Sequence, residues 1–293
     1  MKPQPILLDM PHHIKQSIIN HSDVITKFRL RQCSKDFKAL TERNRVHFGF
    51  LNIFIGESSI RINIFHSECQ RNMTWHSKDA KLPNFHFKHR IETEDFMGGA
   101  VDWLMNTLRT NMIFLDSFDL HFMAGKGRNQ EFLMKLTNSL AEFGQVHAKS
   151  LTINDRGNGV ISLDPIISYL QPKILENIEV HVLPEFSLDS LTQTDQWKHA
   201  KHLRLCGTTR LPYQNWQHFE TTHMHMQHLT LEMVKEDVEN FLRNPNARKW
   251  EVEFETSDER AIEGYLMQKK INSKEEKSLK ICADYGCFQI KRI

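Results

Sequence analysis

Three histidines, His223, His225 and His228, lie close enough together in the sequence to suggest a metal site. Zinc accepts imidazole ligands, and three of them at spacings of two and three could in principle bind it. Two of them alternate with Met224 and Met226, as residues do along a strand, and no paired cysteines stand nearby. We therefore interpret the cluster as strand or surface histidines and expect no metal site.

The cysteines and glycines do not indicate a catalytic or phosphate-binding site either. Cys206 follows His202 on the same expected strand, and in a chain with 17 histidines some proximity of cysteine and histidine is expected by chance. Neither G-x-x-x-x-G-K-[ST] nor G-x-G-x-x-G occurs, and residues 125–128 form only a short basic turn. We expect no catalytic residues, no cofactor and no enzyme activity.

The composition bears on whether the chain binds nucleic acid, forms disulfides or spans a membrane. The 293 residues include 38 basic and 36 acidic side chains, a near balance that does not predict a nucleic-acid-binding face. The five cysteines are odd in number and show no regular framework, which favours a reducing compartment. No apolar run approaches the ~20 residues of a membrane span. We expect a cytoplasmic or nuclear protein with no membrane partner.

The N-terminal segment, residues 6–45, has the pattern of three short helices. Asp9 and Pro11 can begin the first helix, Ser22 the second and Ser34 the third. The residues Leu30, Cys33, Phe37 and Leu40 follow at intervals of three, four and three, the spacing of one helical stripe. A unit this short rarely buries a sufficient core, so its apolar side needs a partner.

The order of residues in this segment resembles the F-box, a helical module that binds Skp1 in cullin-based ubiquitin ligases. Met10 departs from it, because most members have leucine there. The resemblance implies a Skp1-binding surface that includes Leu8, Met10, Pro11, Ile14, Ile18, Ile19, Val24, Phe28, Leu30, Cys33, Phe37 and Leu40. An ordinary N-terminal helical hairpin, packed on the rest of the chain, is the alternative.

Residues 46–112 form the expected middle segment. Two β-branched and aromatic runs flank a turn that contains Gly56, which predicts a β-hairpin over residues 50–65. Residues 85–87 form one further candidate strand. Apolar spacing predicts a helix from Asp102 to Arg109, and two glycines at 98 and 99 weaken its extension toward the N-terminus.

The C-terminal segment, residues 113–293, repeats a four-residue pattern with apolar residues in the second and fourth places. Copies occur at 117–120, 150–153, 177–180, 202–205, 228–231, 249–252 and 278–281. From the second copy on, the first apolar residues are 151, 178, 203, 229, 250 and 279, a spacing of 21 to 29 residues. Helices are expected between them, at 129–143, 163–170, 188–200, 213–221, 234–243 and 258–271. Such a period indicates stacked strand-and-helix units.

The alternation of apolar and polar residues inside these strands indicates whether helices cover one face of the sheet or both. In a doubly wound sheet both faces are covered and strands tend to be continuously apolar, whereas these strands alternate. We therefore predict an α/β fold with all helices on one face, a leucine-rich-repeat-like arc with an open sheet face. An ordinary α/β sheet with one exposed face is the alternative.

Residues 151–255 also resemble a known domain. The stretches LQPKILENIEV, QWKHAKHLRL, WQHFE and LEMVKEDVENFLRNPNARKWEVEF look like FTH, a domain of unknown function that follows the F-box in a large nematode family. In that family an F-box, a β-rich segment and this domain occur in the same order. The resemblance implies no catalytic residues.

Together these patterns predict a substrate-recognition adapter of a Skp1–cullin–F-box ubiquitin ligase, with the repeats binding a target protein for ubiquitination and degradation. The alternative is a repeat scaffold that binds or blocks a protein partner without a ligase. The open face turns acidic, so a protein ligand suits it better than nucleic acid. The candidate target-binding residues are Thr152, Asn154, Glu179, His181, Arg204, Thr230, Glu232, Glu251, Glu253 and Lys280.

Overall fold

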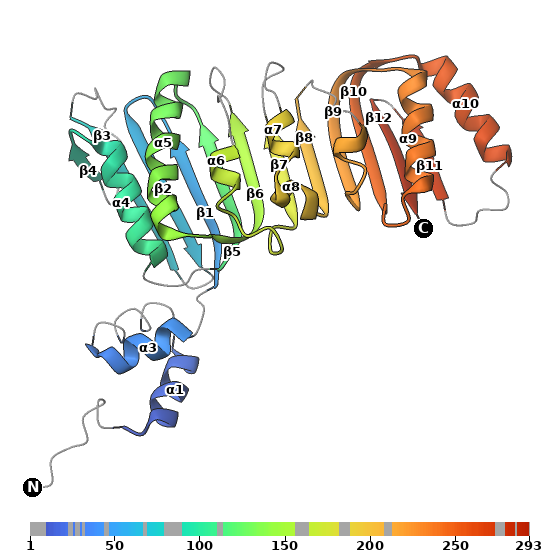
Figure 1. Ribbon diagram of the computed structural model, residues 1–293. Coiled ribbons are helices and arrows are strands. Elements are labelled where there is room, and N and C mark those ends of the chain that lie inside the picture. The colour runs from blue at the N-terminus through green and yellow to red at the C-terminus, as the bar shows by residue number, and fades with distance from the viewer. Residues whose placement is uncertain are drawn as a thin grey trace, which may run out of the picture.

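The computed structural model describes residues 10–22, 26, 30, 33–43, 47–66, 69–78, 90–109, 114–155, 164–181, 188–207, 213–272, 279–284 and 286–292. Its main feature is a single twelve-stranded sheet, flanked on one face by helices (Figure 1). The candidate strand at 85–87 lies outside the described residues.

The first four strands form one end of the sheet: β1 (His47–Ile55), β2 (Ser59–His66), β3 (Cys69–Ser77) and β4 (Arg90–Thr93). β1 and β2 pair antiparallel, with Leu51 opposite Ile64, so the predicted hairpin is confirmed. β3 continues antiparallel and β4 adds a parallel edge. On β1, the odd-numbered residues 51, 53 and 55 are fully buried, which places the even-numbered ones on the opposite face.

Six parallel strands form the middle of the sheet: β5 (Phe114–Phe122), β6 (His147–Asp155), β7 (Asn177–His181), β8 (His202–Cys206), β9 (Thr221–Leu229) and β10 (Lys249–Ser257). They neighbour one another in chain order, and β5 also pairs with β1. After β10 the chain adds two antiparallel strands, β11 (Leu279–Asp284) and β12 (Cys287–Arg292). β12 lies between β10 and β11.

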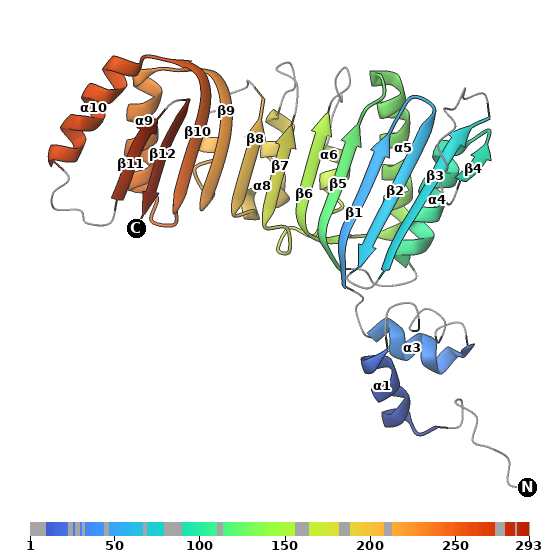
Figure 2. The ribbon, with the colours of Figure 1, turned by 180° about the vertical axis from the view of Figure 1, so that it is seen from behind.

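The helices associated with the sheet differ greatly in length. They are α4 (Phe96–Arg109), α5 (Lys126–Phe143), α6 (Asp164–Ile167), α7 (Asp189–Thr192), α8 (Asp195–His199), the 3₁₀ turn η2 (Tyr213–Asn215), α9 (Leu231–Arg243) and α10 (Glu259–Asn272). Figure 1 shows α4 to α9 in front of the strands, and Figure 2, from behind, shows the strands uncovered. None of the described helices is long and apolar enough to span a membrane.

The mixed α/β class, with a large sheet and associated helices, is confirmed. The finer leucine-rich-repeat-like description is not, because the helical connections range from 18 residues in α5 to four in α6 and antiparallel strand pairs flank the parallel strands on both sides. α4 also begins earlier than predicted, at Phe96. Asp95 accepts a hydrogen bond from the Gly98 N–H at 2.9 Å and so offsets the poor helix propensity of the glycines.

One hydrophobic core runs the length of the sheet. Its members include Phe48 on β1 and Ile290 on β12, so it draws described residues from both sides of the predicted boundary at 112. The division of the chain at that point stays a prediction. The structure packs both segments into the same sheet and the same core.

The strand predicted at 228–231 is wrong in its position. β9 runs from Thr221 to Leu229, so it overlaps the predicted strand only at residues 228 and 229, and the chain then enters α9 directly. Thr230 is the N-cap of α9, its hydroxyl accepting from the Met233 N–H at 3.2 Å, and Glu232 lies in the first turn. A hydroxyl cap followed by an acid stabilises a helix start, and this local preference outweighs the apparent alternation.

The N-terminal module consists of α1 (His12–His21) and α3 (Lys35–Arg43), with a few described residues between them. It has its own small core of Ile19, Leu30, Phe37 and Leu40, which shares no member with the core of the sheet. Ser34 caps α3, accepting from the Phe37 N–H at 3.2 Å, as predicted. Ser22 instead ends α1, donating from its hydroxyl to the Ile18 carbonyl.

Candidate functional site

The open face of the sheet presents polar residues in rows that cross the strands. The middle row runs Asp119, Thr152, Glu179, Arg204, His223, Glu251 and Gln289 on β5 to β10 and β12. The next row runs His121, Asn154, His181, Cys206, His225, Glu253 and Cys287. Parallel register places each of these side chains beside the next at the ~4.8 Å spacing of neighbouring strands.

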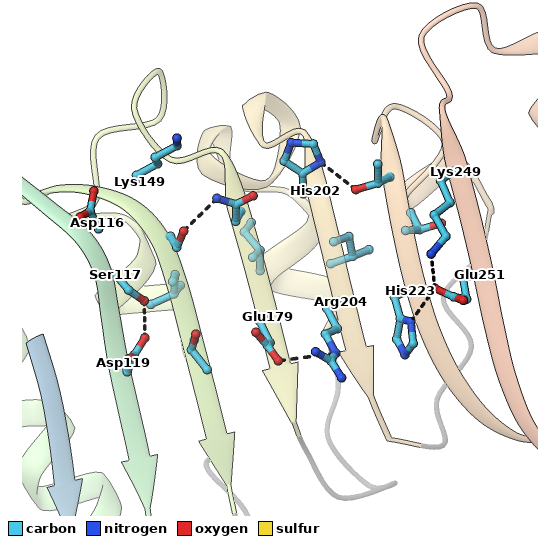
Figure 3. Close-up of a pocket in the computed structure, with 18 of the residues that line it drawn as sticks. Asp116, Ser117, Asp119, Lys149, Glu179, His202, Arg204, His223, Lys249 and Glu251 are labelled. Atoms are coloured by element: carbon cyan, nitrogen blue, oxygen red, sulfur yellow. Dashed lines mark hydrogen bonds and ion pairs between the residues drawn. The ribbon is translucent and has the colours of Figure 1, made fainter. Parts of the chain in front are cut away.

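Figure 3 shows the central part of this face, a shallow depression of about 790 Å³. Near its middle, Arg204 Nε lies 3.6 Å from Glu179 Oε1, an ion pair between β8 and β7. The Arg204 side chain is 53% exposed, so the pair contributes at most ~1 kcal/mol to stability. The same exposure leaves the guanidinium accessible to a binding partner.

Glu251 is the most heavily bonded carboxylate on the face. It accepts from Lys249 Nζ at 2.7 Å and from Gln289 Nε2 at 2.9 Å, and it lies 3.3 Å from His223 Nδ1. These contacts, led by Lys249, lower the pKa of Glu251 to about 2. The carboxylate is therefore charged at any physiological pH and fixed in orientation.

Asp119, at the other side of the depression, has the opposite environment. Burial raises the pKa of this carboxyl, and hydrogen bonds from Ser117 and Thr152 partly offset the effect. Two acids of the same row thus differ: Glu251 is held by a cation, whereas Asp119 is held by hydroxyls.

By strand register, eight of the ten candidate target-binding residues lie on this open face: Thr152, Asn154, Glu179, His181, Arg204, Glu251, Glu253 and Lys280. Thr230 and Glu232 do not, because they begin α9. Lys280 lies on β11, opposite Lys291, and β12 separates it from β10. The β9 positions of the two rows are held by His223 and His225.

Sequence reasoning missed an aromatic group at the β1 end of the face. Phe50 is 52% exposed, and the rings of Phe54 and His121 stack with centroids 4.4 Å apart. The Arg61 guanidinium lies over the Phe54 ring at 5.0 Å. Alternation within the predicted hairpin was the available signal, because Phe50 and Phe54 must point to the same face of a strand.

The candidate Skp1-binding residues divide into two groups. Ile19, Leu30, Phe37 and Leu40 are buried within the N-terminal module. Pro11, Ile14 and Cys33 are exposed, and Met10 and Ile18 are partly so. Leu8, Val24 and Phe28 lie outside the described residues. The stripe predicted from the sequence therefore combines internal packing with surface.

The described part of the chain contains no group of three or more His, Cys, Asp or Glu residues that could hold a metal ion. His223 and His225 lie on β9, consistent with their interpretation as strand histidines, and the His223 ring is engaged with Glu251. The face offers paired charges, hydroxyls and one aromatic group, which suits the binding of another molecule.

Two protein families match this chain. Residues 7–49 match the F-box domain, and residues 130–269 match the FTH domain. The FTH match begins within α5 and ends within α10, so it covers most of the parallel sheet. Neither a curated protein nor a solved structure gives a significant match. This chain is therefore an F-box protein with a C-terminal FTH domain.

Proposed function

We propose that this protein is a non-catalytic substrate receptor of a Skp1–cullin–F-box ubiquitin ligase, acting in the cytoplasm or nucleus. The F-box domain supports the adapter role. The observation that carries the proposal is the presence of two separate cores, one in an N-terminal module that exposes the apolar Ile14 and one in a sheet whose open face is polar. In such a ligase this chain contributes proximity between target and catalytic subunits.

The structure sharpens which residues would contact Skp1. Residues buried in the module stabilise it, so the contact falls to Met10, Pro11, Ile14, Ile18 and Cys33, together with candidates outside the described residues. Ile14 is 39% exposed, an apolar side chain that a partner would cover.

Co-purification with Skp1 tests this assignment. Ile14→Asp places a charge in the proposed apolar contact and should weaken Skp1 retention by at least ~10-fold. His13→Asp, on the adjacent exposed position of α1, introduces the same acid and should leave Skp1 bound. If the intact chain retains no Skp1, the adapter function is wrong; if both variants retain it fully, the contact assigned to Ile14 is wrong.

We propose that the target protein binds the open face of the sheet, which would serve as a leucine-rich-repeat-like binding surface. The candidate contacts are Thr152, Asn154, Glu179, His181, Arg204, Glu251 and Glu253, with His223 and Lys249 added from the geometry of the depression. Lys280 at the edge is a more distant candidate. Burial of so many charges favours a partner with complementary charges, because the face itself contains both signs.

A pull-down with and without proteasome inhibition should identify this target as a protein that accumulates when the chain is absent. Arg204→Glu should then reduce its recovery, because the substitution reverses the exposed charge at the centre of the face. Lys198→Glu on α8 makes the same change on the helix-covered side and serves as the control. Equal recovery with both variants would place the target elsewhere.

The alternative, a scaffold that binds or blocks a protein without a ligase, predicts a different result. Deleting residues 1–45 removes the module, whose core is separate from that of the sheet. A deleted chain that keeps its full biological activity would support the scaffold.

A further inference from the structure

One cysteine of the open face lies between two imidazoles. Parallel register places Cys206 on β8 directly beside His181 on β7 and beside His225 on β9. His181 Nε2 in turn lies 2.6 Å from Glu179 Oε1. Thiol, imidazole and carboxylate are therefore neighbours on two adjacent strands.

The electrostatics of this cluster favour a charged pair. The hydrogen bond with His181 lowers the pKa of Cys206, and Arg204 contributes in the same direction. The contact with Cys206, aided by that with Glu179, raises the pKa of His181. A thiolate beside an imidazolium is the reactive form of cysteine, and Cys206 is only partly buried, so small reagents can reach it.

A second cysteine of the same row provides a comparison. Cys287 on β12 is also partly buried, but its thiol donates to Glu251 Oε1 at 3.7 Å. Glu251 is a fixed negative charge, and a neighbouring negative charge opposes formation of a thiolate. Cys206 and Cys287 are thus similarly exposed, but Cys206 lies beside the basic His181 and Cys287 beside the negatively charged Glu251.

We propose that Cys206 is a peroxide-reactive modification site on the open face. The thiolate sulfur attacks one oxygen of hydrogen peroxide and the O–O bond breaks. The departing hydroxide takes a proton from the His181 imidazolium, so the products are a sulfenic acid, water and neutral imidazole. Glu179 is a positioning residue, which holds the imidazole beside the sulfur. The site goes beyond the adapter function and does not depend on it.

The test follows all five cysteines of the full-length chain by mass spectrometry. Native protein is treated with limiting hydrogen peroxide plus a cyclic 1,3-dione that traps sulfenic acids, and separately with iodoacetamide. Cys206 should react about 3- to 10-fold faster than Cys287 in both experiments, because an unperturbed thiol is only a few per cent ionised at neutral pH. A rate at Cys206 equal to or below that at Cys287 would overturn the proposal.

Two variants separate the role of His181 from general exposure. His181→Gln keeps a polar side chain but removes the imidazolium, and should slow the reaction of Cys206 toward the rate of Cys287. His121→Gln changes a histidine of the same row on β5, three strands from Cys206, and should leave the rate unchanged. Circular dichroism checks that both variants fold. An unchanged rate in folded His181→Gln would refute the role of the imidazole.

Discussion

The N-terminal module and the sheet differ in how they use apolar residues. Among its described residues, the module buries the apolar side chains of Ile19, Leu30, Phe37 and Leu40 and leaves Ile14 on its surface. The sheet buries apolar residues from β1 to β12 and presents polar ones on its uncovered face. A small module with an exposed apolar side chain gains stability when a partner binds it. A large sheet is stable through its own core, so its exposed face can be polar and can select a partner.

Substituting the same residue in each core gives the largest expected effect. Phe37 and Phe132 are both fully buried, in the module and beneath the sheet respectively. Phe→Ala should cost about 3–5 kcal/mol at either place. Phe132→Ala should lower the main unfolding transition, whereas Phe37→Ala should abolish hydrogen-exchange protection in α1 and α3 only. Loss of protection in both regions from Phe37→Ala would show that the two cores are coupled.

Arg292 tests how the C-terminal edge of the sheet is held. Its guanidinium donates to the carbonyls of Phe241, Asn244 and Ala247, which joins β12 to the end of α9. Arg292→Ala should destabilise the sheet by about 2–3 kcal/mol in urea unfolding, because buried carbonyls lose a charged donor. Arg292→Lys keeps the charge without the planar fork and should recover part of the loss. No change with alanine would contradict this account.

Glu251 should make the stability of the sheet depend on acid pH. Its folded pKa, about 2, lies below the ordinary value of 4.5, so its contribution is present above pH ~5 and disappears as pH falls toward 2. Glu251→Gln should therefore lower stability by on the order of 1–2 kcal/mol near neutral pH and by almost nothing at pH 2. Thermal unfolding across this range provides the measurement, and a constant difference would refute the ionic cause.

The smallest expected effect tests whether Thr230 caps α9 and lies outside the open face. Removing the N-cap hydroxyl with Thr230→Ala should cost about 1 kcal/mol, whereas Thr230→Ser should keep it. Neither variant should alter target recovery, because Thr230 no longer belongs to the open face. Urea unfolding and the target pull-down distinguish the two roles. A loss of target with the serine variant, at unchanged stability, would return Thr230 to the binding surface.

Local patterns predicted much of this structure. The hairpin at 50–65, the Ser34 cap and most of the alternating strands depend on residues close together in sequence, which is why they were found. The position of β9 was missed because 228–231 alternates like a strand while Thr230 also caps a helix. Alternation alone could not rank these two possibilities; the cap at Thr230 favours the helix, and the burial of Met224 and Met226 favours the strand that precedes it.

By itself, the sequence determined the class of the fold, the helical module at its start and the alternation that separates a buried face from an open one. Only the tertiary structure decided which residues of that face are neighbours. Strand order and register are set by pairing between distant segments, as when β12 inserts beside β10 and when Cys206 comes to lie between His181 and His225. Such pairing follows from the packing of the whole core, which local residue spacing does not specify.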